Sequence, residues 1–116
     1  MTKKTLLIDL DGVLNTYNGS FNKDFIPSTL NGAKKFLQNL SKKFEIKIFT
    51  TRNKLLTAKW LIQNDLDSFI TDITDKKELS WLYIDDRCIQ FKGDFEKLTQ
   101  DINNFQPWYK INAVDA

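Results

Sequence analysis

The sequence has no histidine and only one cysteine, Cys88, among its 116 residues. The lack of histidine excludes histidine general bases, histidine metal ligands and Ser-His-Asp triads built from this chain. A single cysteine cannot form an internal disulfide, and without a histidine to activate it a cysteine-nucleophile mechanism is disfavoured. Whatever chemistry the chain performs must therefore use carboxylates, lysine or hydroxyl groups.

The net charge is also small, and long apolar segments are absent from the sequence. Seventeen basic and fifteen acidic residues leave a formal charge of +2, so no strong overall field draws the protein to nucleic acid or to a membrane. No apolar run approaches membrane-spanning length, and the opening MTKKT lacks the apolar region of a signal peptide. We therefore expect no membrane partner and a cytoplasmic location.

The composition is that of a folded protein. Hydrophobic residues make up 41% of the chain and aromatic residues 13%, which is typical of a globular chain and not of a disordered one. A chain of this length fits one domain and can bury a core. We expect a single domain that covers residues 1–116.

Short apolar runs alternate with segments of helical period. The runs cover residues 5–10, 44–49, 67–73 and 81–84, and apolar residues recur at three- and four-residue steps in 30–40, 55–62 and 95–105. This order predicts an α/β fold with a mostly parallel sheet and helices on both faces. The tail from residue 107 onward fits no element, and we expect it to form an irregular arm.

Polar residues follow three of the four apolar runs. Asp9 and Asp11 lie at the end of the first, Thr50 to Arg52 follow the second, and Asp85 to Arg87 follow the fourth. Each group taken singly is typical of a solvated turn. Ligands of open parallel sheets bind beyond the carboxyl ends of the strands, however, so the joint placement predicts one functional site at that edge.

These residues resemble the motifs of the haloacid dehalogenase superfamily of phosphatases and phosphotransferases. The similar segments are DLDGV, IKIFT and LYIDD, with an upstream lysine in DKKELSWLYIDD, and the resemblance runs from residue 6 to about residue 95. It implies a three-layer, Rossmann-like fold whose central parallel sheet has the strand order 3-2-1-4. The segments between the motifs have no room for the cap domain that many members carry.

The resemblance also implies a role for each site residue. Asp9 is expected to be the nucleophile and Asp11 the general acid and base, with Thr50 and Lys77 holding the phosphoryl group; Lys76 remains an alternative to Lys77. Mg²⁺ is the expected cofactor, and its implied ligands are Asp9, Asp11, Asp85 and Asp86, the last bound directly or through water. The implied substrate-binding residues are Gly12, Thr51, Arg52 and Arg87.

The function implied is a Mg²⁺-dependent phosphomonoester hydrolase that acts through an aspartyl-phosphate intermediate. A site without a cap suits a large phosphorylated substrate, such as a nucleic-acid 3′-phosphate or a phosphoprotein, or a homo-oligomer in which a neighbour covers the cleft. The alternative is a non-catalytic module that binds Mg²⁺, phosphate or a protein partner on the same fold.

Plainer readings stand beside several of these assignments. Thr50 alone would also suit the cap of the following helix. Arg52 and Arg87 either hold the substrate phosphate or pair with nearby carboxylates. We interpret four further residues as packing or surface residues: Thr51, Trp60, Trp81 and Cys88.

Overall fold

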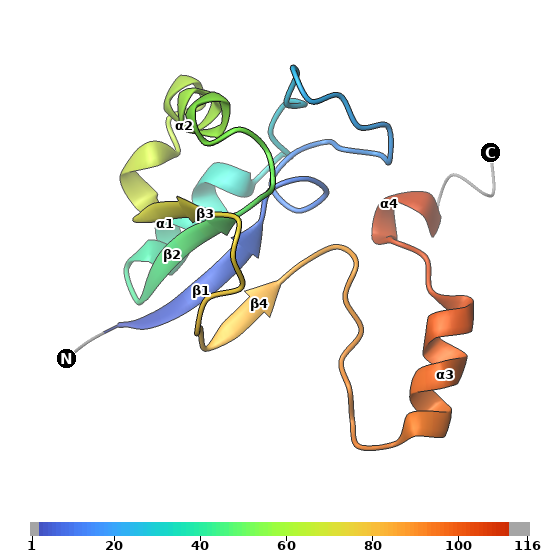
Figure 1. Ribbon diagram of the computed structural model, residues 1–116. Coiled ribbons are helices and arrows are strands. Elements are labelled where there is room, and N and C mark those ends of the chain that lie inside the picture. The colour runs from blue at the N-terminus through green and yellow to red at the C-terminus, as the bar shows by residue number, and fades with distance from the viewer. Residues whose placement is uncertain (1–2, 112–116) are drawn as a thin grey trace. The chain divides into compact units, whose positions relative to one another are not determined.

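The computed structural model describes residues 3–111, and the chain divides into two compact units at the Asp85–Asp86 peptide bond. The first unit holds strands β1 (Lys4–Asp9), β2 (Phe44–Phe49), β3 (Asp72–Thr74) and β4 (Leu82–Ile84), helices α1 (Ala33–Ser41) and α2 (Lys54–Gln63), and the 3₁₀ turn η1 (Asp67–Phe69). The second holds α3 (Phe95–Asn104) and α4 (Trp108–Ile111). Figure 1 follows these elements along the chain.

The four strands form one parallel sheet in the order β3-β2-β1-β4, so the predicted order is confirmed. Strand β1 lies in the interior of the sheet, where Ile8 is opposite Ile48 on one side and Ile84 on the other. Its residues Leu6, Leu7 and Ile8 are all buried. A continuous apolar run of this kind is what an interior parallel strand requires.

One face of the sheet carries the hydrophobic core. Leu6 and Ile8 of β1 alternate with residues that point the other way, and both belong to the core cluster together with Leu37 of α1 and Leu61 of α2. Both helices of the first unit therefore cover the same face. We expected helices on both faces of the sheet, but among the described residues of this unit they cover only one. The reason is that α1 and α2 connect strands that advance in one direction across the sheet.

The third strand is shorter and later than predicted. The apolar run over residues 67–73 begins with η1, and strand β3 starts only at Asp72. Phe69 and Ile70 pack against the core cluster. These two residues are apolar because their side chains cover the edge of the core, not because they belong to a strand. Pairing with β2 begins where the Thr71 amide donates to the Ile46 carbonyl.

The second unit is helical. Asp94 caps α3 by accepting hydrogen bonds from the amides of Glu96 and Lys97, as expected for an aspartate at this position. The irregular arm predicted from residue 107 onward is wrong as far as residue 111, since Trp108–Ile111 forms the short helix α4, and the rest of that tail lies outside the described residues. None of the helices in the described part of the chain is both long and apolar enough to cross a membrane.

Candidate functional site

Two carboxylates meet where neighbouring strands end. Asp9 is the last residue of β1, and Asp85 directly follows β4, the strand that pairs with β1. A carboxylate oxygen of Asp9 and one of Asp85 lie within 4.8 Å of each other. Strand β1 is largely buried and β4 is a more exposed edge strand, and both acids lie at the carboxyl edge of the sheet, as the sequence predicted.

The next residues along the chain, Asp86 and Arg87, begin the second unit. Within that unit the Tyr109 hydroxyl donates a hydrogen bond of 2.7 Å to Oδ2 of Asp86. Tyr109 was not among the expected site residues. Its contact depends on the folding of α4, which the sequence did not predict.

Asp11 lies in the turn after β1 and is held on both sides. Its Oδ1 accepts from Nδ2 of Asn15 at 3.0 Å, and its Oδ2 accepts from Nε of Arg52 at 2.8 Å. Arg52 therefore pairs with a carboxylate, which confirms one of its two readings. The contact joins the turns that follow β1 and β2, and it fixes the direction of the Asp11 side chain.

The turn itself is organised by Asn15, a residue that the sequence analysis missed. Asn15 is fully buried, and its Oδ1 accepts from the amides of Gly12 and Tyr17 at 3.1 and 3.0 Å. Gly12 has φ +83°, a left-handed conformation that favours glycine. The Gly12 amide is thus engaged within the turn. A polar residue straight after the apolar pair Val13-Leu14 was the available signal.

Thr50 follows β2, and both its amide and its hydroxyl are engaged in the turn. The amide donates to the Thr74 carbonyl at 2.9 Å, and Oγ1 accepts from the Arg52 amide at 3.2 Å. Helix α2 is capped by Asn53 and not by Thr50, so the capping alternative is wrong. A hydroxyl that accepts one hydrogen bond still has a proton to donate, for example to a phosphoryl oxygen.

The Arg52 side chain is almost completely buried, at 1% exposure. Besides Asp11 it donates to the Asn22 carbonyl at 2.8 Å, and its guanidinium lies 4.5 Å from the centre of the Phe21 ring. Its Nη2 atom is buried without a hydrogen-bond partner. Thr51, next to it, is exposed. A buried unpaired donor is costly, so this atom is suited to an incoming acceptor.

A pocket of about 400 Å³ lies at the ends of β2 and β3. Its lining residues are Thr50, Arg52, Lys54, Asp72, Ile73, Thr74, Asp75, Lys76 and Glu78. Of the two candidate lysines, Lys76 lines this pocket. The Nζ atom of Lys77 lies 4.8 Å from the centre of the Tyr83 ring.

Trp60, Trp81 and Cys88 are packing or surface residues, as we interpreted them from the sequence. Trp60 is buried in the core cluster, where its Nε1 donates to the Pro27 carbonyl. Trp81 stacks on Phe44 with ring centres 5.5 Å apart. Cys88 is exposed.

The donor set suits a hard divalent cation. Asp9 and Asp85 offer carboxylate oxygens at close range, and two like charges so placed repel each other unless a cation lies between them. Mg²⁺ and Ca²⁺ both prefer oxygen ligands, whereas zinc sites usually include histidine or cysteine. The arrangement can therefore hold a cation beside the turn that carries Asp11.

Comparison with known proteins supports the fold alone. No protein-family model and no curated protein matches the chain. A solved structure of a conserved protein from Bacteroides thetaiotaomicron is similar, with a TM-score of 0.57 and 17% identity over 95% of this chain and 98% of that one. The chain thus shares an α/β fold with that protein, built here on a four-stranded parallel sheet.

Proposed function

We propose that the protein is a Mg²⁺-dependent phosphomonoester hydrolase of the haloacid dehalogenase type, acting through an aspartyl-phosphate on Asp9. The observation that carries the proposal is the approach of Asp9 and Asp85 to within 4.8 Å at the ends of paired strands. Asp11 lies two residues beyond Asp9 in a hydrogen-bonded turn. These acids match, in place and in type, what in-line attack on a phosphate ester needs.

In this mechanism an oxygen of Asp9 attacks phosphorus, and the alcohol leaves with a proton from Asp11. Asp11 then takes a proton from the water that hydrolyses the aspartyl-phosphate. Asp9 and Asp85, with Asp86 and the Asp11 carbonyl, would hold the Mg²⁺, which supplies positive charge to bring the anionic carboxylate and phosphate together. Each Asp11 oxygen accepts one hydrogen bond, from Asn15 or from Arg52, and keeps a second lone pair that can hold the proton.

The phosphoryl oxygens would be held by Thr50 and by a lysine. Placement in the same pocket as Thr50 favours Lys76 over Lys77 for that role. Arg52 lines the same pocket, and its unpaired Nη2 makes it a second candidate donor to the phosphate. Arg87, which follows Asp86, stays a proposed substrate contact.

The substrate is proposed to be large, such as a nucleic-acid end with a 3′-phosphate or a phosphoprotein. Between β1 and β2 the chain forms a loop and the single helix α1, and between β2 and β3 it forms α2 and η1. Neither connection contains a further domain that could close over a small molecule. Alternatively, a neighbouring copy of the chain in a homo-oligomer would cover the site.

One observation favours the non-catalytic alternative. The Gly12 amide and both oxygens of Asp11 are already engaged within the protein. A module that only binds Mg²⁺, phosphate or a protein partner would leave these contacts in place and would need no proton transfer at Asp11. Turnover measurements separate the two proposals.

The test is a screen of phosphorylated metabolites, nucleotides and 3′-phosphorylated oligonucleotides with Mg²⁺. We expect phosphate release that EDTA abolishes and Mg²⁺ restores. Asp9→Asn should abolish release, because it removes the nucleophilic oxygen and a ligand charge. Asp67→Asn, at an exposed aspartate of η1, is the matched control and should retain full activity. Full activity in Asp9→Asn would rule out the proposed nucleophile.

A further inference from the structure

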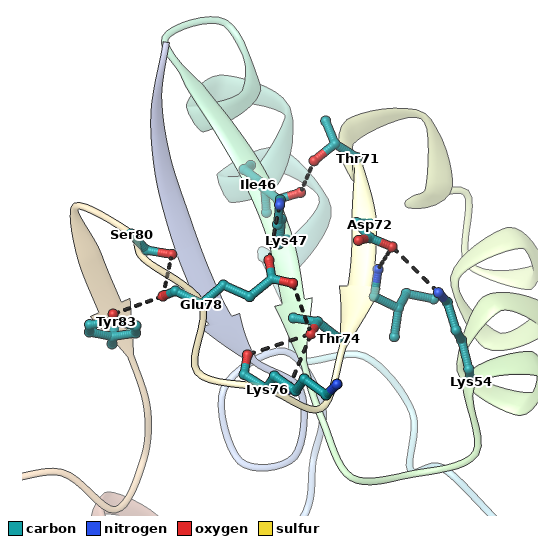
Figure 2. Close-up of polar contacts among 11 residues, drawn as sticks. Ile46, Lys47, Lys54, Thr71, Asp72, Thr74, Lys76, Glu78, Ser80 and Tyr83 are labelled. Carbon is teal, nitrogen blue, oxygen red and sulfur yellow. Dashed lines mark hydrogen bonds and ion pairs between the residues drawn. The ribbon is translucent and has the colours of Figure 1, made fainter.

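The segment between β3 and β4 carries both candidate lysines and crosses the sheet. Because β2 and β1 lie between these strands, the chain must travel three strand spacings, about 14 Å. It does so on the face that α1 and α2 leave open, where Lys47 of β2 points. Figure 2 shows Glu78 of this segment extended toward Lys47 and Thr74.

Glu78 is the residue through which this segment is attached. Its Oε1 lies 3.0 Å from Nζ of Lys47, and its Oε2 accepts from Oγ1 of Thr74 at 3.3 Å. Its backbone carbonyl accepts from the Tyr83 hydroxyl at 2.9 Å and from the Ser80 hydroxyl at 3.2 Å. One residue thus connects the segment to β2, to the end of β3 and to β4 (Figure 2).

Lys76 lies between two of these attachment points. Its amide donates to Oγ1 of Thr74 at 3.1 Å, and its carbonyl accepts from the Glu78 amide at 2.9 Å. The backbone of Lys76 is therefore tied on both sides, to the end of β3 and to Glu78. This tie keeps the residue at the rim of the pocket that contains Thr50.

The charges of this contact balance each other. The hydrogen bond and the negative charge of Glu78 raise the pKa of Lys47 above its usual value, so Lys47 keeps its positive charge at neutral pH. A carboxylate beside a phosphate site would repel the substrate, but the Lys47 ammonium offsets that charge. The two side chains are 25% and 36% exposed, and pairs of this exposure add little to global stability. Their effect is expected to be local.

We propose that Glu78 is a positioning residue which, neutralised by Lys47, holds the turn over residues 74–78 so that Lys76 faces the phosphoryl group. The inference rests on the proposed phosphatase function and adds two residues, Lys47 and Glu78, to those that determine how the phosphate is bound. It also assigns the phosphate-binding lysine to Lys76. Glu78 acts through Lys76 and not on the reaction itself.

Steady-state kinetics with an aryl phosphate and Mg²⁺ test the positioning role of Glu78. Glu78→Ala should lower kcat/KM roughly tenfold, chiefly through KM, with little change in Tm. Glu78→Gln, which can still hydrogen-bond Lys47 and Thr74, should recover most of the loss. Asp101→Ala removes the exposed Lys97–Asp101 pair of α3 and serves as the matched control, which should leave KM unchanged. Loss of Tm with an unchanged KM in Glu78→Ala would make Glu78 merely structural.

A double-mutant cycle tests whether Glu78 acts through Lys76. In a Lys76→Met background, Glu78→Ala should cause no further loss of kcat/KM. In a Lys77→Met background the full roughly tenfold loss should persist. Equal losses in both backgrounds, or a loss abolished only by Lys77→Met, would overturn the proposal.

Calorimetric titration with inorganic phosphate separates this inference from the proposed hydrolase activity. If no substrate is turned over but Glu78→Ala binds phosphate several-fold more weakly than the unchanged protein, the hydrolase proposal fails and the positioning role stands. If turnover occurs and Glu78→Ala behaves as the unchanged protein, the positioning role fails alone. Absence of both turnover and phosphate binding would overturn both.

Discussion

At the scale of single residues, the two aspartates after β1 have different surroundings although one residue separates them. Asp9 approaches Asp85, whereas Asp11 is hydrogen-bonded to Asn15 and Arg52. The resemblance could assign unequal roles to them in advance, because their order in DLDGV is fixed. The partners of Asp11 could not be predicted, since they come from side-chain directions within a turn and from a residue 41 positions away.

The unequal roles predict unequal effects of substitution at Asp11. Asp11→Asn should greatly slow an alkyl phosphate, typically by about 10²-fold or more, because the alkoxide needs a proton to leave. An aryl phosphate with a good leaving group should still form the aspartyl-phosphate and then hydrolyse it slowly. Rapid-quench kinetics should therefore show a burst with the aryl substrate. Equal slowing of both substrates without a burst would contradict the assigned role.

Substitution of Asn15 is expected to lower the stability of the protein and not to act directly on the reaction. Asn15→Ala leaves the Gly12 and Tyr17 amides without this acceptor in a buried turn. The free energy of unfolding should fall by about 2 kcal/mol, as for other buried groups that lose a partner. Asn18→Ala is the control, because Asn18 is exposed and accepts one 3.3 Å contact from Ser20. Urea denaturation of both variants checks this, and equal stabilities would refute it.

At the scale of elements, the family resemblance implied the correct strand order, and the apolar pattern predicted the first two strands well but the third poorly. Runs 5–10 and 44–49 are apolar because they lie in the sheet against the core, so sequence pattern and structure agree. In the run over 67–73, Phe69 and Ile70 are apolar for another reason, namely that they cover the core edge beside η1. Pattern alone cannot separate these causes. It also cannot choose between adjacent lysines, whose side chains leave a turn in different directions.

The contact between β2 and the crossing segment predicts a pH dependence. Since Glu78 raises the pKa of Lys47, the stabilisation by this contact is present below the usual lysine pKa and is lost as the pH rises through the raised value. The Tm difference between the unchanged protein and Lys47→Met is expected to be small for so exposed a pair, and it should be constant from neutral pH to about pH 10 and shrink above it. Thermal scans across this range measure it. A difference that persists unchanged at the highest pH would exclude the contact as its source.

At the scale of the whole molecule, the core residues all belong to the first unit. They come from β1, β2, α1, α2 and the loops between them. Helix α3 of the second unit contains no buried residue. The expectation of one domain over residues 1–116 stays a prediction, and the two units have separate internal packing.

This division predicts the course of limited proteolysis. Arg87 and Lys92 are exposed and lie outside regular elements, between β4 and α3, where chains are most readily cut. Brief trypsin treatment should therefore yield a resistant N-terminal fragment that ends at Arg87 or Lys92. Mass spectrometry identifies the ends. Early cleavage at Lys54 or Lys59 of α2 would show that the first unit is the less stable one.

The position of β1 between β2 and β4 has a consequence for the rates at which the site forms during folding and is lost during unfolding. Of the two partners of Leu6, Ile46 is the nearer along the chain, and Leu82 is almost twice as far away in sequence. Contacts that are this distant form late, because the closure of a long loop must precede them. Asp9 and Asp85 would then meet after the transition state for folding. A cation held between them would slow unfolding far more than it would speed folding, and so would lengthen the lifetime of the native protein.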